Sequence, residues 1–225
     1  MKQPIKNTIK NIFWDVDGVL VDLNFAYFNL LTNHPNYKDM YRGLKWEELP
    51  KVLPISPEIG ALELETHPTL GMQMDYDFTR TPEFFVNRPL YPNVVETLRQ
   101  LDKLGYRQFT MSATSLSVEA KKEFVSNVLA DAKDFLTVEC VFHDNLTEKE
   151  DSLKSCLEKY GLKAEETILV DDRIYNIYSA MRAGIYTVRL KSEFTTDLPA
   201  DLDWVVEVKD IVELKNWLLD EENNG

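Results

Sequence analysis

From about residue 90 onward, the chain alternates between helical and extended hydrophobic patterns. Apolar side chains recur at helical spacing over 94–104, and Gly105 follows before an extended apolar run over 106–112. This order predicts a helix, a turn and a strand. Gly105 suits the turn because glycine adopts the left-handed conformation that commonly ends a helix without steric cost.

The same helix, glycine and strand order occurs twice more, over 153–170 and 174–190, with Gly161 and Gly184 after the helices. Repeated units of this kind indicate a parallel sheet covered by helices. The predicted fold class is therefore α/β, a Rossmann-like parallel sheet core with helices on both faces. Further predicted elements are strands over 138–142 and 204–208 and a closing amphipathic helix over 211–219.

Residues 23–88 interrupt this alternation. They contain six prolines and short aromatic-rich helical pieces, such as 24–31, without a convincing strand pattern. We therefore predict an α/β core domain formed by residues 1–22 and 89–225, and a small α-helical cap domain formed by residues 23–88. Near the return to the core, Arg80 and Arg88 are expected to form salt bridges on an acidic surface rather than to contact a substrate.

Charge and composition narrow the possible partners. The chain has 38 acidic and 25 basic residues, a net charge of -13 and no basic run, so its surface should repel nucleic acid and anionic lipid. Cys140 and Cys156 have neither metal-ligand spacing nor the density of a disulfide scaffold. The sequence also lacks a signal-peptide pattern and a bilayer-spanning apolar segment. We therefore expect a cytoplasmic protein.

Two carboxylates follow the first apolar run, in the stretch IFWDVDGVL. Asp15 and Asp17 lie two residues apart at the expected carboxyl end of a strand, where open parallel sheets bind ligands, and both should face one small volume. Two such charges about 4 Å apart repel by about 4 kcal/mol at an effective dielectric near 20. The pair therefore requires a cation or a shared proton. From this stretch alone, a turn with solvated acids remains the alternative.

Other strand ends carry complementary groups. A hydroxyl and backbone N–H groups can bind an anion after the second strand, a lysine follows the third, and two acids and an amide follow the fourth. Metal-assisted phosphoryl transfer needs oxygen ligands for a hard cation, donors and positive charge for phosphate, and a carboxylate nucleophile for covalent catalysis. In chain order these residues are Ser112, Ala113, Lys149, Asp171, Asp172 and Asn176.

The motifs DVDGVL, TMSATS, Lys149 and VDDRIYN, in this order, resemble those of the haloacid dehalogenase (HAD) superfamily. The resemblance covers residues 10–215, and the insertion is similar in position and size to the helical cap of the subgroup that contains phosphoglycolate phosphatase and β-phosphoglucomutase. The lysine is the least specific element, since Lys154, Lys121 and Lys122 also lie on helices nearby.

Four positions depart from the common pattern of this superfamily. Trp14 stands where phenylalanine is usual, Ala113 replaces a frequent asparagine, and Asn176 replaces an aspartate. Arg173 follows the metal-binding acid, where a small residue is commoner. These departures weaken any claim for a specific substrate.

The resemblance implies a phosphatase that acts on a small phosphorylated metabolite. Asp15 would attack the phosphorus and form an aspartyl-phosphate. Asp17 would protonate the leaving oxygen and then deprotonate the hydrolytic water. Most of the catalysis would come from positioning and charge neutralisation.

The resemblance also implies a Mg²⁺ site and a phosphate site. Mg²⁺ would be held by the carboxylates of Asp15 and Asp172 and by the backbone carbonyl of Asp17, with Asp171 or Asn176 in support. The phosphoryl oxygens would be bound by Ser112, Ala113 and Lys149.

Three other functions are possible on this fold. A dehalogenase has no leaving group to protonate and lacks the second acid, so Asp17 opposes that function. A phosphomutase or phosphotransferase on a sugar phosphate shares the core residues and stays open. A phospho-accepting signalling module is opposed by the motif order and by the chain length. The protein is expected to be a monomer or a homodimer.

Overall fold

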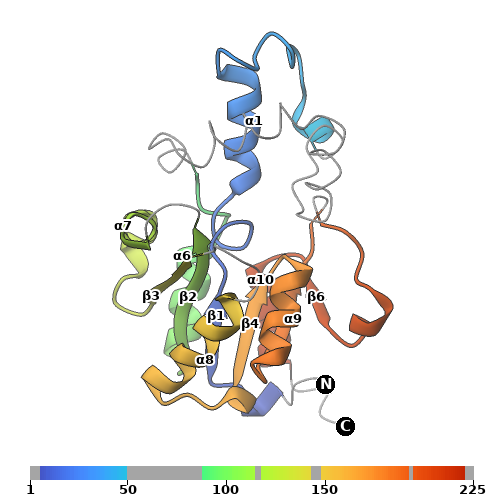
Figure 1. The fold of residues 1–225 in the computed structure, drawn as a ribbon. Helices are drawn as coiled ribbons and strands as arrows, with labels where there is room; N and C mark the ends of the chain where they lie inside the picture. The colour runs from blue at the N-terminus through green and yellow to red at the C-terminus, as the bar shows by residue number, and fades with distance from the viewer. Residues whose placement is uncertain (1–5, 50–87, 115–117, 143–147, 193–194, 221–225) are drawn as a thin grey trace.

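The computed structural model describes residues 6–49, 88–114, 118–142, 148–192 and 195–220. In this part of the chain, six parallel strands form one sheet in the order β3-β2-β1-β4-β5-β6 (Figure 1). The predicted α/β fold with a parallel sheet is thus confirmed. The strands are β1 Asn11–Trp14, β2 Arg107–Thr114, β3 Thr137–Phe142, β4 Thr167–Asp171, β5 Tyr186–Leu190 and β6 Val206–Val208.

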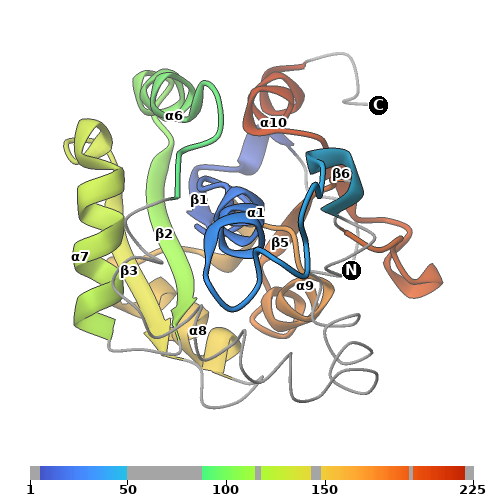
Figure 2. The ribbon, with the colours of Figure 1, turned by 90° about the horizontal axis from the view of Figure 1, so that it is seen from above.

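Helices cover both faces of the sheet. Viewed from above, α6 and α10 lie on one side and α8 and α9 on the other (Figure 2). The alternation of side chains along β1 explains how the strand serves two layers, because Trp14 packs with α6, α7 and α10 whereas Phe13 packs with α8 and α9. These helices are α6 Val94–Lys103, α7 Val118–Val128, α8 Glu148–Tyr160, α9 Ile174–Arg182 and α10 Ile211–Leu219.

The predicted turn glycines have the expected backbone conformation. Gly105, Gly161 and Gly184 follow α6, α8 and α9 with φ of 90°, 60° and 76°. The predicted strand over 204–208 is two residues too long at its start. Residue Val205 donates its N–H to the carbonyl of Leu202 at 2.9 Å and completes a turn, so β6 begins at Val206.

The described part of the predicted cap contains α1 Leu23–Asn33 and the 3₁₀ turn Trp46–Glu48. Asp22 caps the start of α1, because its carboxylate accepts the N–H of Phe25 at 2.9 Å. The helix stands beyond the carboxyl ends of the central strands (Figure 1). A small apolar cluster around Leu31 and Tyr37 packs this segment. Residues 50–87 lie outside the described residues, so the cap boundaries stay a prediction.

The two connections between the cap segment and the core run side by side. Val21 and Leu90 form an antiparallel bridge, and the N–H of Asp22 donates to the carbonyl of Pro89 at 2.8 Å. The chain therefore leaves the core and returns to it at one place, next to the end of β1.

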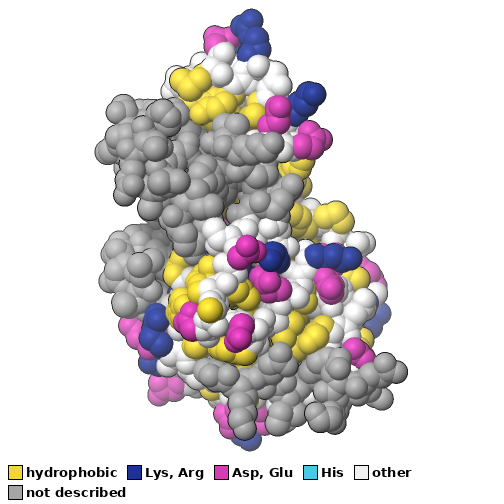
Figure 3. All heavy atoms as spheres, turned by 90° about the vertical axis from the view of Figure 1, so that its right-hand side faces the viewer, with side chains coloured by type: hydrophobic (Ala, Val, Ile, Leu, Met, Phe, Trp, Pro, Cys, Tyr) yellow, Lys and Arg dark blue, Asp and Glu magenta, His cyan; other side chains and the backbone are white. Residues whose placement is uncertain are grey.

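On the face seen in Figure 3, acidic and basic side chains are interspersed with exposed hydrophobic ones. Among the described helices, none is long and apolar enough to cross a membrane. Cys156 is a buried free thiol.

Candidate active site

The register of the sheet brings the motifs to one edge. Trp14, the last residue of β1, lies beside Thr110 of β2 and Val170 of β4. Asp15 comes next, and its N–H donates to the carbonyl of Val170 at 2.9 Å. Because the three strands are parallel, Asp15 is held between β2 and β4, next to Asp171 at the carboxyl end of β4.

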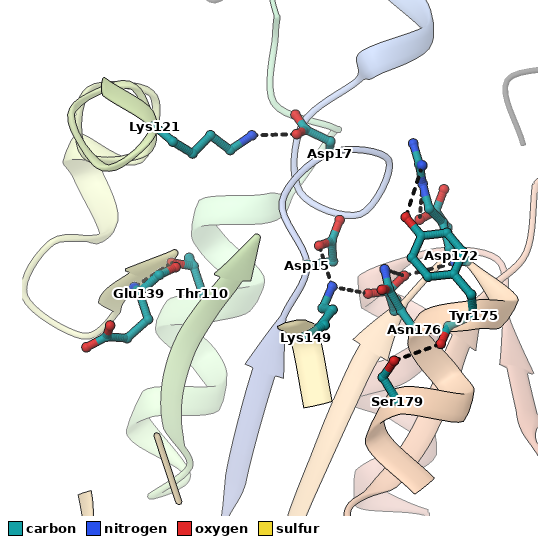
Figure 4. Close-up of polar contacts among 12 residues, drawn as sticks. Asp15, Asp17, Thr110, Lys121, Glu139, Lys149, Asp172, Tyr175, Asn176 and Ser179 are labelled. Carbon is teal, nitrogen blue, oxygen red and sulfur yellow. Dashed lines mark hydrogen bonds and ion pairs between the residues drawn. The ribbon is translucent and has the colours of Figure 1, made fainter. Parts of the chain in front are cut away.

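Lys149, in the first turn of α8, joins two of the acids. Its ammonium lies 2.8 Å from Asp15 Oδ1 and 2.5 Å from Asp171 Oδ2, and its side chain is fully buried (Figure 4). Lys154, one of the alternatives, instead pairs with Glu150 on the same helix. The predicted lysine is thus the one that contacts the first and last motifs.

Burial changes the proton affinity of these groups. It raises the pKa of Asp15 to about 6, an effect that Lys149 opposes and Asp171 strengthens. Burial alone would lower the pKa of Lys149, but Asp15 and Asp171 raise it above its ordinary value. The lysine is therefore charged and partly neutralises an acidic site.

The neighbouring acids Asp171 and Asp172 have different surroundings. Both carboxylate oxygens of Asp171 accept hydrogen bonds. Oδ1 accepts the backbone N–H of Arg173 at 2.9 Å and the side-chain amide N–H of Asn176 at 3.0 Å, and Oδ2 accepts the ammonium of Lys149. Asp172 Oδ1 is buried without a hydrogen-bond partner among the described residues. Burial raises the pKa of Asp172 to about 7, with Arg173 lowering it and Asp171 raising it further.

These acids form a set of oxygen ligands suited to a hard divalent cation. Asp15, Asp171 and Asp172 each offer a carboxylate oxygen within 4.8 Å of the others. Since both oxygens of Asp171 already accept hydrogen bonds, Asp15 and Asp172 are the more available pair. The loop after β1 packs closely here, because a Cβ added to Gly18 would lie 2.7 Å from Asp172 Oδ2, and Gly18 has a φ of +84°. The residues therefore fit a cation such as Mg²⁺.

The side chain of Asp17 does not face the same volume as that of Asp15, contrary to the expectation from the sequence. Its carboxylate points toward Lys121 of α7 and also pairs with Arg88 (Figure 4). The side chains of both cations are only 2% exposed. The alternation of an extended strand does not reach Asp17, because β1 ends at Trp14 and the chain then turns.

Two cations therefore determine the charge state of Asp17. Burial would raise the pKa of this carboxyl, but Lys121 and Arg88 lower it well below its usual range. Arg88 forms a salt bridge, as predicted, but not on the surface, because its side chain is buried against the candidate catalytic acid Asp17. Arg80 lies outside the described residues.

The second motif provides a buried hydroxyl. Ser112 on β2 is 1% exposed, and its Oγ has no hydrogen-bond partner among the described residues. Buried hydroxyls usually have a hydrogen-bond partner, so this position suits a ligand or a water molecule. Ala113 follows on the same strand and packs against the apolar cluster that contains Phe13.

Sequence reasoning missed two contributions to this site. Lys121 was only an alternative to Lys149, although both lysines contact candidate catalytic acids. Arg189 of β5 was not singled out, yet its Nε donates to the backbone carbonyl of Asp172 at 3.1 Å and its Nη1 pairs with Glu207 at 3.2 Å. An arginine in the apolar run YTVRL was the available signal, because a buried charge needs a partner.

A model of the haloacid dehalogenase-like hydrolases matches residues 12–190 of the sequence, a range that includes every candidate site residue from Asp15 to Asn176. The chain belongs to this family. It is therefore a HAD-like hydrolase, and the resemblance inferred from the motifs is confirmed. A search among curated proteins found no match.

Solved structures share the HAD fold over nearly the full chain. A predicted phosphatase from Clostridium acetobutylicum is 17% identical with a TM-score of 0.62, covering 94% of this chain and 98% of its own. CbbY from Rhodobacter sphaeroides, in complex with phosphate, is 19% identical with a TM-score of 0.59, covering 92% and 96%. A dehalogenase with an intermediate complex is 15% identical with a TM-score of 0.63, covering 95% and 99%. At these identities the likeness shows the fold alone.

Proposed function

We propose that this HAD-like hydrolase is a Mg²⁺-dependent phosphatase that hydrolyses small phosphomonoesters through a phosphorylated Asp15. The observation that carries the proposal is the convergence of Asp15 and Asp172, whose carboxylate oxygens lie within 4.8 Å of each other. The buried, unpartnered Asp172 Oδ1 supports a cation ligand at this position.

The metal ion would be held by the carboxylates of Asp15 and Asp172, with the backbone carbonyl of Asp17 as the third proposed ligand. A bound Mg²⁺ would neutralise phosphoryl charge. Asp171 and Asn176 would support the site by fixing Lys149 and the start of α9, as their hydrogen bonds indicate.

The phosphoryl group would be bound opposite these acids. The Ser112 hydroxyl has no hydrogen-bond partner among the described residues, so it can donate to a phosphoryl oxygen. The Lys149 ammonium lies 2.8 Å from the nucleophile Asp15 and can contact another oxygen on the reacting phosphorus. Ala113 would contribute its backbone N–H. In the first step, Asp15 forms a bond to phosphorus while the bond from phosphorus to the ester oxygen breaks.

Asp17 would serve as the acid and base of the two steps. Its pairs with Lys121 and Arg88 favour the ionised carboxylate, which is the form that accepts a proton from the water attacking the phosphorylated Asp15. To protonate the leaving oxygen in the first step, Asp17 must first take up a proton from solvent, which weakens its pairs with these cations. Hydrolysis should therefore be faster for esters whose leaving group needs little protonation.

A dehalogenase is one competing activity on this fold. Halide displacement has no leaving oxygen to protonate, whereas this chain holds Asp17 with two buried cations. The pairing of Asp17 thus favours phosphoester hydrolysis.

The test compares metal and nucleophile dependence in the purified protein. With p-nitrophenyl phosphate, we expect turnover with Mg²⁺ and its loss in excess EDTA. Asp15→Asn should lower kcat by at least about 10³-fold, since it removes the nucleophile. Asp131→Asn, an exposed acid in the turn Ala130–Ala132, is the matched control and should keep full activity. Equal turnover in EDTA, or an active Asp15→Asn protein with native unfolding behaviour, would refute the proposal.

A further inference from the structure

Arg173 differs from the other cations near the proposed site. It directly follows Asp172 and precedes α9, and its backbone N–H donates to Asp171 Oδ1 at 2.9 Å. Its side chain is 27% exposed, whereas the other four cations are nearly inaccessible. Their side-chain exposures are 2% for Arg88, 2% for Lys121, 0% for Lys149 and 1% for Arg189.

The guanidinium group of Arg173 makes few hydrogen bonds to the described residues. Its Nη1 donates to the Tyr175 hydroxyl at 3.2 Å. Its Nε lies 4.0 Å from Asp172 Oδ1, close enough for an ion pair but not for a hydrogen bond. Since arginine carries five N–H donors, the described residues leave most of this fork without an acceptor.

The Arg173 guanidinium carries a positive charge. A guanidinium stays protonated in proteins, and the Asp172 carboxylate lies beside it. If a divalent cation binds Asp172, the attraction of that carboxylate for Arg173 is offset. The guanidinium then lacks a full counter-charge among the described residues of the site.

Arg173 also lies toward the cap segment. The Tyr27 phenol of α1 interacts electrostatically with it, and α1 stands beyond the carboxyl ends of the central strands (Figure 1). In the proposed reaction the phosphorus lies at Asp15, so the rest of the substrate would extend away from the strand ends. Arg173 adjoins Asp172 at these strand ends and interacts with the Tyr27 phenol of α1, so it is placed to meet that part of the substrate.

We infer that Arg173 binds a second anionic group, a carboxylate or a phosphate, on the leaving portion of the phosphomonoester. A guanidinium fork accepts either group through two parallel hydrogen bonds. The inference rests on the proposed phosphatase function and narrows its substrates to phosphorylated acids or bisphosphates.

The test uses pairs of esters that differ only in the second anion. One pair is 2-phosphoglycolate and ethyl phosphate, and the other is propane-1,3-diyl bisphosphate and propyl phosphate. The first pair tests a carboxylate and the second a phosphate. For at least one pair, the wild-type kcat/KM should be about 10- to 100-fold higher for the anionic member, as expected for a charge-assisted hydrogen-bonded contact.

Arg173→Met should bring that ratio close to one, mainly through a higher KM for the anionic ester, and Arg173→Lys should keep part of it. Arg182→Met is the matched control, because Arg182 lies at the far end of α9 and pairs with Glu150. It should leave the ratio unchanged. Calorimetric binding of 3-phosphonopropionate against propylphosphonate, which cannot be hydrolysed, should show the same preference and its loss in Arg173→Met.

The outcomes separate the two proposals. If the wild-type protein hydrolyses none of the four esters or p-nitrophenyl phosphate, the phosphatase function fails, and the inference with it. If it hydrolyses anionic and neutral esters equally well, only the inference fails. If Arg173→Met lowers kcat/KM for both members of a pair by the same factor, Arg173 acts on the shared phosphoryl group or on folding, and the inference is overturned.

Discussion

The ammonium of Lys121 on α7 pairs with the carboxylate of Asp17, although the two residues are 104 positions apart in the sequence. A second cation, Arg88, reaches the same carboxylate from the point where the chain returns from the cap segment. The proposed acid and base is therefore held by a core helix and by the cap connection together. Its orientation depends on parts of the chain that no single motif contains.

Lys121→Met should destabilise the protein by about 1–3 kcal/mol, because it leaves a buried Asp17 with one cation instead of two. The adjacent Lys122 provides a matched control. Its side chain is 43% exposed and lies 4.0 Å from Glu139, so Lys122→Met should change the unfolding free energy by less than about 0.5 kcal/mol. Urea unfolding at neutral pH measures both. Equal effects of the two substitutions would show that the Asp17 pair contributes no special stability.

Much of the fold could be predicted because it depends on local patterns. The helices over 94–103 and 211–219 and the turn at Gly105 follow from apolar spacing and from the conformational freedom of glycine. The motif carboxylates Asp15 and Asp172 could also be predicted to converge, since parallel strands bring their carboxyl ends to one edge.

The ion-pair partners could not be predicted, because they depend on how side chains from distant elements pack. Lys121 has an exposed lysine next to it in sequence, and Arg189 lies in an otherwise apolar strand. Local patterns do not distinguish a buried cation from a solvated one. Arg88 was assigned to the surface for this reason.

The stability of the fold should depend on pH through Glu139 on β3. Its carboxylate accepts hydrogen bonds from the ammonium of Lys159 at 2.5 Å and from the hydroxyl of Tyr160. Burial would raise the pKa of Glu139, but these two partners lower it below 4.5. The contacts thus stabilise the fold above about pH 4.5, and the stabilisation is lost as the pH falls through the lower folded pKa.

Glu139→Gln should therefore lower the unfolding free energy by about 1 kcal/mol at pH 7. The value is modest because the Lys159 side chain is 57% exposed. This difference in unfolding free energy between Glu139→Gln and wild type should shrink as the pH falls below about 4.5. Urea unfolding at pH 7 and at several lower pH values measures it, and a difference that is independent of pH would contradict the assignment.

The close approach of Gly18 to Asp172 predicts a loss of function from a single methyl group. Gly18→Ala places a Cβ 2.7 Å from Asp172 Oδ2 at a φ of +84°, so it should displace the proposed metal ligand. Gly105→Ala meets the same backbone strain at a φ of +90°, but has nothing within 4 Å. Each substitution should cost about 1–2 kcal/mol of stability.

Only Gly18→Ala should raise the Mg²⁺ concentration that gives half-maximal phosphatase activity, by about 10-fold or more, as expected for a displaced ligand. Titration of activity with Mg²⁺ provides the measurement. If the two alanine variants respond alike to Mg²⁺, the approach of the loop to Asp172 has no bearing on metal binding.

The contrast between Asp171 and Asp172 predicts opposite effects of two neighbouring substitutions. Asp171→Asn removes a partner of the buried Lys149 and should lower the unfolding free energy of the metal-free protein by about 2 kcal/mol. Asp172→Asn removes a carboxylate whose charged form is disfavoured by burial and whose Oδ1 has no hydrogen-bond partner among the described residues. Its metal-free stability should stay the same or rise.

Mg²⁺ should reverse that order. A ligand that binds only the folded state at 100 times its Kd adds about 2.7 kcal/mol to the unfolding free energy. The wild-type protein and Asp171→Asn should gain such stability with Mg²⁺, whereas Asp172→Asn should gain little because one of the two available carboxylates is missing. Thermal unfolding in EDTA and in Mg²⁺ tests this. An equal rise in Tm for Asp172→Asn and wild type would exclude Asp172 as a metal ligand, because the cation would then bind without it.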